Sequence, residues 1–548
     1  MKKKWIGREV DNERIKRIKE ETGNNVIISA LLSNRFGDDY LKEINLSVDN
    51  LTDPMRLPDM DKAIDRILEA IDNNEKVLVY GDYDADGVTA TNIIYTFLKD
   101  QGLDVAYYIP NRLKEGYGLN KPRLKEFKDM GYTLTITVDT GIVAFEEALY
   151  CKEIGMDLVI TDHHEVQDGR IPEAISVVDP KREECDLEFK EIAGCFVAFK
   201  LVQALSEVIG MPENYDKKFL SIVAIGTIAD VMPLKSENRI AVEYGLKNIK
   251  ENPNDGVRQL VKDLNSITAM NIAFSVVPKL NAAGRLGEDT GAEMLMSSSE
   301  EEAKNILTQL NLLNEKRKQL VIDITKKVSE IVDNNQLQKN NVIVVEGDFH
   351  EGVVGIIASK IAEKYGKSAI ILSKEGTVYK GSGRSNGTMS LFDAVNKVKH
   401  LTEKFGGHAA AVGMTISEEN IEEFKNELYK IEIEEHPKEI YYDMLFNFKN
   451  ISVDLIKSFD ILEPFGKENE KPVFLFKNVN VKKIYEREKM VSALFSQENK
   501  QIFGITFSKD LFKDIKENDT IYLLATLDIN NYNNREDVQL QIIDMKKI

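Results

Sequence analysis

Residues 77–87 read Val-Leu-Val-Tyr-Gly-Asp-Tyr-Asp-Ala-Asp-Gly, a short apolar run followed by a turn that carries three carboxylates. A fully apolar run of this length is typical of a strand buried inside a parallel sheet. Residues 89–99 then show helical character, so the segment predicts a strand, a tight turn and a helix. A strand followed by a helix is the repeating unit of open α/β sheets.

The same order recurs further along the chain. Residues 134–138 and 158–161 predict buried strands, residues 142–154 predict a helix between them, and residues 175–178 predict a fourth strand. Strands that alternate with helices predict a doubly wound parallel sheet and place the chain in the α/β class. An aspartate follows each of the four predicted strands, namely Asp82, Asp139, Asp162 and Asp179.

The second half of the chain predicts two further folding units. Residues 300–335 contain neither glycine nor proline, and their apolar side chains recur at helical spacing. A helix of this length spans about 50 Å, so we expect it to connect two lobes. A smaller α/β unit follows and ends in a glycine-rich turn at 381–385, and five short β-type runs with polar turns, such as 530–534, predict a barrel of the OB-fold type. We therefore divide the chain into an N-terminal extension (1–60), a first α/β domain (61–298), a connecting helix (299–335), a second α/β domain (336–436) and the barrel (437–548).

Composition sets limits on the function. The 548 residues include 72 basic and 91 acidic side chains, which gives a net charge of −19 and argues against a general electrostatic nucleic-acid binder. No apolar run approaches the length of a membrane-spanning helix, and no signal peptide is recognisable at the start. Three scattered cysteines form neither a disulfide framework nor a zinc motif, so we expect a cytoplasmic protein: Cys151, Cys185 and Cys195.

The position of the acidic residues carries the chemistry. In an open parallel sheet, ligands bind beyond the carboxyl ends of the strands, so the four aspartates should meet at one edge with the histidines of Asp162-His163-His164. Carboxylates this close repel one another unless cations neutralise them. Carboxylate and imidazole ligands suit Mn²⁺ or Mg²⁺, and two such ions about 4 Å apart would support phosphoester hydrolysis. A single aspartate after a strand could instead cap the next helix or complete a turn, but four at once disfavour that interpretation.

Asp162-His163-His164 is also the triplet that names the DHH phosphoesterase family. The chain resembles this family, and its bacterial single-strand-specific exonuclease branch, over nearly its whole length. The matching segments are 81–87, 138–142, 226–231 and 281–285, together with 381–385 and 406–409, which resemble the DHH-associated domain. The resemblance implies a DHH catalytic domain at 61–298, a DHH-associated substrate-binding domain at 336–436 and a nucleic-acid-binding OB-fold at 437–548.

The resemblance further implies a role for each matching residue. The implied ligands of two Mn²⁺ or Mg²⁺ ions are Asp82, Asp84, Asp86, Asp139, His163 and Asp230, with Asp139 between the two ions. The implied catalytic residues are His164, as a donor to the scissile phosphate, and Arg285, as its clamp, beside Asp139. The implied substrate-binding residues are Arg112, Ser382 and Arg384 for a terminal 5′-phosphate, Tyr117 for stacking and His408 in a substrate loop. Three of these residues also have an ordinary structural explanation: a salt bridge for Arg285, a loop aromatic for Tyr117 and turn chemistry for Ser382.

Two positions depart from the pattern of this branch. Phe196 stands where a small residue is usual, and its bulk could change the packing near the site. Asp179 stands before Pro180 where an asparagine is common, so we leave Asp179 out of the ligand set.

The leading hypothesis is a 5′→3′ exonuclease that releases 5′-mononucleotides from single-stranded DNA in DNA repair and recombination. A single-strand-binding protein and a helicase are the implied partners, and the implied state is a monomer. The alternative within the family is a phosphoesterase of oligoribonucleotides, 3′,5′-bisphosphate nucleotides or pyrophosphate, which would need only the two lobes. A non-catalytic binder should lack ligands that are present here, and a dinucleotide-dependent oxidoreductase lacks its G-x-G-x-x-G motif after the first strand. Because of the negative net charge, we expect one local basic groove leading to His163, lined by Arg112, Lys114, Arg285, Lys380 and Arg384.

Overall fold

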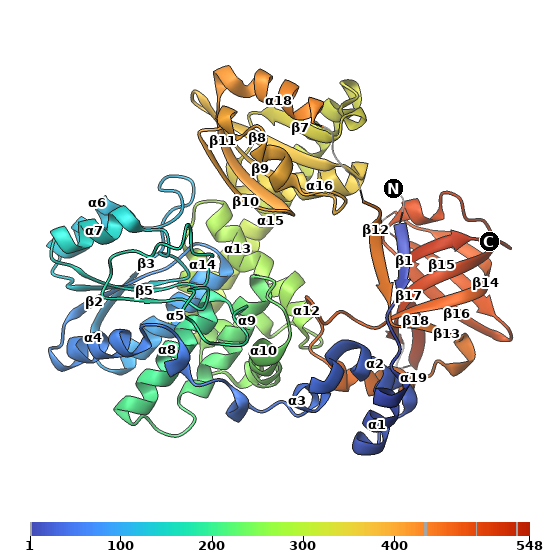
Figure 1. Cartoon of the computed structure of the whole chain (residues 1–548), viewed down its shortest axis with the longest axis horizontal. Helices are drawn as coiled ribbons and strands as arrows, with labels where there is room; N and C mark the ends of the chain where they lie inside the picture. The colour runs from blue at the N-terminus through green and yellow to red at the C-terminus, as the bar shows by residue number, and fades with distance from the viewer. Residues whose placement is uncertain (1–2, 432–435, 489, 533–534) are drawn as a thin grey trace. The chain divides into compact units, whose positions relative to one another are not determined.

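The computed structural model describes residues 3–431, 436–488, 490–532 and 535–548 (Figure 1). The chain forms two compact units. Unit 1 comprises Leu51–Met232 and Tyr244–Lys438, and unit 2 comprises Lys2–Asn50, Pro233–Glu243 and Glu439–Ile548. The N-terminal segment therefore belongs to the same unit as the C-terminal barrel. Among the described residues, no helix is both long enough and apolar enough to cross a membrane.

The first sheet of unit 1 is parallel throughout and has the strand order β3-β2-β4-β5-β6. Side chains of α6 and α7 pack into the core on one face of this sheet. Helices α4, α5 and α8 also contact its strands. This arrangement confirms the predicted doubly wound sheet and adds one strand, β3, that the sequence analysis did not predict. The strands are β2 (Lys76–Tyr80), β3 (Asp104–Tyr108), β4 (Leu134–Val138), β5 (Asp157–Thr161) and β6 (Ser176–Val178), and the helices are α4 (Met60–Asp72), α5 (Ala85–Asp100), α6 (Lys121–Asp129), α7 (Phe145–Glu153) and α8 (Gly194–Ile209).

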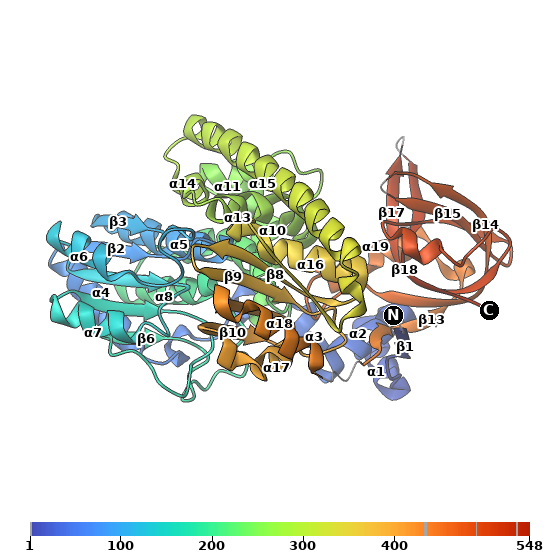
Figure 2. The same cartoon turned by 90° about the horizontal axis from the view of Figure 1, so that it is seen from above.

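A group of helices follows the first sheet. They are α9 (Leu220–Ala229), α10 (Ser236–Asn248), α11 (Asp255–Val261), α12 (Ala269–Asn271), a π-helical turn (Ile272–Val276), α13 (Val277–Arg285) and α14 (Thr290–Met296). The predicted long helix is present as α15 (Glu300–Asn334), which Figure 2 shows along much of its length. Ser299 caps its first turn, and Val321, Val328 and Val332 bury its later part in the core of the next lobe.

The second lobe of unit 1 is a mixed sheet with the order β10-β11-β9-β8-β7. Helix α16 packs on one face, and α17 and α18 contribute to the core on the other. The predicted glycine-rich turn at 381–385 is wrong for most of its length, because residues 381–384 form the end of β9 and pair with both β8 and β11. The elements are β7 (Val342–Gly347), α16 (Val354–Tyr365), β8 (Ser368–Glu375), β9 (Val378–Arg384), α17 (Leu391–Asn396), β10 (Lys404–His408), β11 (Ala411–Ser417) and α18 (Ile421–Lys430).

Unit 2 contains the predicted five-stranded barrel. Strands β14, β15, β16, β18 and β17 follow one another around it, and pairing of β14 with β17 closes the ring, as in an OB-fold. Phenylalanine, isoleucine and leucine side chains make up most of its core, which also includes apolar residues of α1 and α2. Strand β17 extends through part of the predicted polar turn at 530–534, whose residues 533–534 lie outside the described residues. The elements are β1 (Lys3–Gly7), α1 (Asn12–Thr22), α2 (Val26–Phe36), α3 (Tyr40–Ile44), β12 (Lys438–Tyr442), β13 (Met444–Phe446), α19 (Val453–Lys457), β14 (Val473–Glu486), β15 (Val491–Gln497), β16 (Lys500–Thr506), β17 (Thr520–Tyr532) and β18 (Arg535–Lys547).

Candidate active site

The turn between β2 and α5 presents the first carboxylates. Asp82 is buried just beyond the end of β2. Asp84 is the N-cap of α5, and one of its oxygens accepts hydrogen bonds from the backbone N–H groups of Asp86 (2.9 Å) and Gly87 (3.1 Å). The capping explanation considered for a single aspartate therefore applies to Asp84, but capping uses only one of its two oxygens.

Asp86 is fixed by the beginning of another helix. Its carboxylate accepts hydrogen bonds from the backbone N–H groups of Gly194 (2.7 Å) and Cys195 (2.9 Å), the first two residues of α8. Unpaired N–H groups at a helix start favour a negative charge, so the start of α8 fixes the position of the Asp86 carboxylate. These two donors carry no side-chain signal, so the sequence does not reveal them.

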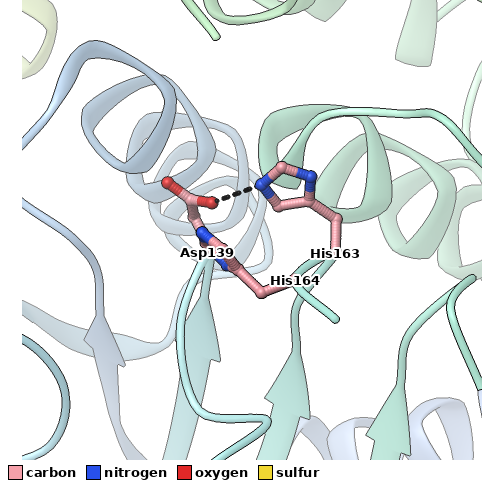
Figure 3. A group of neighbouring side chains, drawn as sticks. All are labelled: Asp139, His163 and His164. Carbon is pink, nitrogen blue, oxygen red and sulfur yellow. Dashed lines mark ion pairs between the residues drawn. The ribbon is translucent and has the colours of Figure 1, made fainter. Parts of the chain in front are cut away.

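Asp139 lies at the end of β4 in a left-handed backbone conformation, with φ of 59°. Its carboxylate approaches His163, which follows β5, with 3.0 Å between its Oδ1 and the Nε2 of His163 (Figure 3). Position 194, which faces the Asp139 carboxylate, requires a glycine, because a Cβ there would lie 2.6 Å from Oδ1 of Asp139. The left-handed conformation is unfavourable for a residue other than glycine, and such conformations are concentrated at functional sites.

The predicted ligands gather in groups whose ligand atoms lie within 4.8 Å of one another. One group is Asp82, Asp84 and Asp139, and a second is Asp86, His163 and Asp230. Nε2 of His163 lies 3.7 Å from Asp86, 3.8 Å from Asp230 and 3.0 Å from Asp139, so Asp139 contacts both groups. The structure thus brings all six predicted ligands together in two adjacent clusters.

The electrostatics of the clusters fit bound cations. Burial and the neighbouring carboxylates raise the pKa of Asp82, Asp84 and Asp139 above the ordinary value of an aspartate. Oδ1 of Asp82 is buried and accepts no hydrogen bond within the described part of the chain. Burial lowers the pKa of His163, which keeps the imidazole neutral, as a metal ligand must be. Divalent cations would satisfy these oxygens and remove the repulsion between them.

His164 differs from His163 in its surroundings. It is half-exposed, and its Nδ1 lies 2.7 Å from Oδ1 of the fully buried Asp162. Although burial opposes protonation, the hydrogen bond and the charge of Asp162 raise the pKa of His164 to about 9. The hydroxyl of Tyr117 lies 3.5 Å from the same ring, and the two rings pack edge to face. A protonated, accessible imidazole can donate a hydrogen bond to an anion.

Asp162 was expected at this edge of the sheet but was given no role of its own. It also accepts hydrogen bonds from the backbone N–H groups of Ile142 (2.9 Å) and His163 (2.7 Å). Burial alone would raise its pKa, but the hydrogen bond and the charge of His164 lower it below the ordinary value. Asp162 therefore positions His164 and stays ionised.

Arg285 ends α13 next to the acidic turn. Asn281 of the same helix accepts a hydrogen bond from the N–H of Ala85 (2.8 Å), and a Cβ at Gly284 would lie 2.3 Å from the carbonyl oxygen of Tyr83. Nη1 of Arg285 donates a hydrogen bond to the carbonyl of Gly352, at 3.2 Å, which leaves most of the guanidinium donors for another acceptor. Burial and the nearby Arg112 and Arg317 lower the pKa of Arg285 to about 10.

Ser382 and Arg384 lie side by side on β9. Nη1 of Arg384 donates to Oγ of Ser382, at 2.7 Å. Both face the start of α16, where a Cβ at Gly355 would lie 3.0 Å from Nη2 of Arg384 and 3.2 Å from Oγ of Ser382. Burial and the charge of Arg112 lower the pKa of Arg384. A serine, an arginine and a helix N-terminus together form a site suited to a phosphate group.

Comparison with known proteins assigns the family. The family model for the DHH family, N-terminal domain, matches residues 76–227, the DHHA1 domain matches 339–432 and the RecJ OB domain matches 442–544. The single-stranded-DNA-specific exonuclease RecJ of Bacillus subtilis is 34% identical over 563 residues, covering 99% of this chain and 71% of that protein. This chain belongs to the RecJ family. The RecJ of Salmonella typhimurium is 28% identical, over 92% of this chain and 93% of the relative.

Solved RecJ structures agree with the fold. RecJ from Thermus thermophilus in complex with Mn²⁺ has a TM-score of 0.86 at 24% identity and covers 100% of this chain and 80% of its own. A second structure, exonuclease RecJ bound to manganese, has a TM-score of 0.61 at 32% identity and covers 70% of this chain and 95% of its own. Manganese in these RecJ structures is consistent with the acidic clusters of this RecJ-family chain.

The remaining predicted residues of this RecJ-family chain are placed as follows. Arg112 lies close enough to both Arg285 and Arg384 to lower the pKa of each of those two residues, as expected for a basic lining. Lys380 instead pairs with Glu351 (3.7 Å) and Glu375 (2.5 Å). Lys114 and His408 are both exposed, and His408, at the end of β10, belongs to none of the ligand groups among the described residues.

The two departures from the branch pattern are both buried. Phe196 packs in α8 against Phe199, with 5.9 Å between ring centroids. Asp179 accepts a hydrogen bond from the N–H of Lys181 and belongs to none of the ligand groups in the described chain.

Proposed function

We propose that this chain is a metal-dependent exonuclease that degrades single-stranded DNA from the 5′ end and releases 5′-mononucleotides. The observation that carries the proposal is the pair of clusters joined by the contact between Asp139 and His163, with the protonated His164 beside them. The RecJ relatives are named as single-stranded-DNA-specific exonucleases.

The six clustered ligands would hold two ions of Mn²⁺ or Mg²⁺, one on Asp82 and Asp84, the other on Asp86, His163 and Asp230, with Asp139 shared. When bound, such ions supply Lewis-acid activation of water and stabilise the leaving oxygen. His164 donates a hydrogen bond to an oxygen of the scissile phosphate. Arg285 offers a planar fork of N–H donors to the same group and fixes its orientation.

The direction of digestion follows from the phosphate site on the second lobe. Ser382, Arg384 and the start of α16 would bind a terminal 5′-phosphate, with Arg112 as a further cation. Anchoring that phosphate leaves the first phosphodiester as the bond that reaches the metal clusters, so one nucleotide is removed at a time. Tyr117, beside His164, would stack on a base near the cut.

The barrel of unit 2 would hold the strand elsewhere along its length. It contains a groove of about 1070 Å³ whose lining includes Tyr485, Arg487, Lys500 and Phe503. Phe503 and Tyr485 are partly exposed, and their ring centroids are 6.1 Å apart. Exposed aromatic rings beside cations are suited to stacking with unpaired bases. A small-substrate phosphoesterase would have no use for this groove, so we place that alternative second.

The cellular setting is part of the same proposal. We propose a monomer that acts in DNA repair and recombination with a single-strand-binding protein and a helicase. The three cysteines are buried and free, which fits a reducing cytoplasm. For the domains we retain the division at 1–60, 61–298, 299–335, 336–436 and 437–548.

The test is digestion of a 5′-phosphorylated, 3′-labelled single-stranded DNA 20-mer with Mn²⁺, beside its duplex and its RNA counterpart. Stepwise shortening from the 5′ end of the single DNA strand, absent in Asp139→Ala, is the expected result. Intact DNA together with hydrolysis of a dinucleotide or a bisphosphate nucleotide would overturn the proposal in favour of the small-substrate enzyme.

A further inference from the structure

An exposed aromatic side chain lies on the helix that ends in Arg285. Phe274 is 77% exposed, and Met270, one turn earlier, is 52% exposed. Phe274 belongs to the π-helical turn Ile272–Val276 between α12 and α13. An apolar spot of two side chains is far smaller than a protein–protein interface, which buries roughly 800 Å² on each partner.

Pro278 gives the π turn a physical cause. Proline has no N–H to donate to the carbonyl four residues earlier, which here is Phe274, and its ring clashes with that carbonyl. A wider turn at this point avoids the clash, and π turns of this kind are frequent at functional sites. The helix therefore continues through Pro278 while Phe274 stays exposed at the widened turn.

Phe274 is aligned with the catalytic end of the helix. Phe274 and Arg285 are eleven residues apart, which corresponds to about three helical turns and roughly 16 Å along the axis. The two residues therefore lie on similar faces of one continuous helix, although the π turn shifts the alignment by a fraction of a turn. Asn281, between them, is hydrogen-bonded to the start of α5. The distance of roughly 16 Å between Phe274 and Arg285 corresponds to several nucleotides of a single strand that leaves the cut site.

Positive charge accompanies this stretch of helix. Lys279 is half-buried, and burial together with the nearby Lys318 and Lys262 lowers its pKa, with Asp263 acting in the opposite direction. Lys318 also pairs with Glu315 at 2.7 Å, so the three lysines and the two acids, Asp263 and Glu315, leave a small excess of positive charge on this stretch. A backbone of phosphates and unpaired bases matches such a combination of cations and an exposed ring.

We propose that Phe274 is a stacking platform for an unpaired base of the DNA strand, several nucleotides from the bond that is cut. The inference rests on the proposed exonuclease function and adds a binding site to it. A base inside a duplex is stacked between its neighbours and offers no free face to the ring, so this site contributes to the preference for single strands. A dinucleotide is too short to reach it.

The test compares Phe274→Ala with the unchanged protein on a 5′-phosphorylated 20-mer and on a 5′-phosphorylated dinucleotide. The KM for the 20-mer should rise about tenfold, as for the loss of one stacked base, while the KM for the dinucleotide stays the same. Phe274→Tyr should restore the KM for the 20-mer. Leu312→Ala is the control, because Leu312 is also exposed, at 68%, on the neighbouring α15 and should change neither value.

A second measurement reports binding without cleavage. The chain has a single tryptophan, Trp5, so Phe274→Trp in an Asp139→Ala background adds one indole whose fluorescence should be quenched by a single-stranded 20-mer. Equal KM values for Phe274→Ala and the unchanged protein, or an equal rise for both substrates, would overturn the inference and leave the exonuclease standing. If the unchanged protein leaves the 20-mer intact, the proposed function fails and this inference fails with it.

Discussion

Nδ1 of His164 lies 2.7 Å from a carboxylate oxygen of Asp162, and Asp162 is completely buried. The pair determines the charge of His164, because the carboxylate raises the pKa of the imidazole to about 9 against the effect of burial. His164 is therefore protonated at neutral pH and can donate to a phosphate oxygen. The activity should depend on Asp162, although that residue has no direct contact with the substrate in the proposed mechanism.

Asp162→Asn should lower kcat/KM by about 10- to 100-fold near neutral pH, as is typical for a residue that supports another functional group. His164 has a raised pKa in the folded protein, so its proton is present below that pKa and is lost as the pH rises through it. The activity should fall on the alkaline side, and the fall should move to lower pH in Asp162→Asn. Kinetics across the pH range, with the exposed Asp168→Asn as control, check this. An alkaline limb that does not move would contradict the role given to Asp162.

The metal-free protein should be destabilised by its own ligand set. Burial raises the pKa of Asp82, Asp84 and Asp139 in the fold, so the folded protein binds more protons than the unfolded chain above about pH 4. The free energy of unfolding of the metal-free protein should therefore fall as the pH rises from the unfolded pKa through the folded values.

Asp139→Asn should raise the Tm of the metal-free protein at neutral pH and abolish the further rise that Mn²⁺ gives to the unchanged protein. At a concentration of one hundred times Kd, one ion should add about 2.7 kcal/mol. Thermal unfolding with and without Mn²⁺ measures both effects, and Asp65→Asn, exposed on α4, is the matched control. A lower metal-free Tm in Asp139→Asn would show that the carboxylate stabilises the fold.

Gly194 should be more important for metal binding than for folding. An added Cβ would lie 2.6 Å from Oδ1 of Asp139, so Gly194→Ala must displace that carboxylate or the start of α8, which also holds Asp86. Overpacking of this kind lowers the free energy of unfolding by about 1–3 kcal/mol. The free energy of Mn²⁺ binding should weaken by at least as much. Calorimetric titration with Mn²⁺ provides the measurement, with Gly413→Ala as control, since a Cβ there meets nothing within 4 Å. An unchanged affinity of Gly194→Ala for Mn²⁺ would mean that the Asp139 carboxylate can shift without disturbing the metal site.

The sequence was sufficient to predict the sheet and the group of acids. Buried apolar runs mark β2, β4, β5 and β6, and the carboxyl ends of parallel strands must meet at one edge. Strand β3 was missed because it lies at the edge of the sheet and most of its side chains are only partly buried, which leaves a weak hydrophobic signal. The association of residues 3–50 with the barrel depends on contacts between distant parts of the chain, which periodicity does not reveal.

Roles within the site were harder to predict than positions. Asp162 follows its strand as Asp139 does, but only the three-dimensional arrangement shows that Asp162 faces His164 while Asp139 faces His163. The donors that hold Asp86 are backbone N–H groups, and any residue type except proline supplies those. Lys380 was predicted to line the basic groove, and its pairing with two glutamates became visible only in the fold.

The direction of digestion can be tested at Arg384. Its side chain lies against Ser382 and the start of α16, far along the chain from the acidic clusters, so Arg384→Ala should weaken recognition of the terminal phosphate and leave the chemistry intact. A charged hydrogen bond contributes about 1.5–3 kcal/mol, which predicts a loss of about 10- to 100-fold in kcat/KM on a 5′-phosphorylated strand. On a 5′-hydroxyl strand the same variant should lose little of its kcat/KM, so the ratio of kcat/KM on the two substrates approaches one. Lys374→Ala, on the neighbouring strand β8, removes a surface pair with Glu418 and is the control. Equal losses on both substrates would instead assign Arg384 to the scissile phosphate, and the preference for the 5′ end would then need another origin.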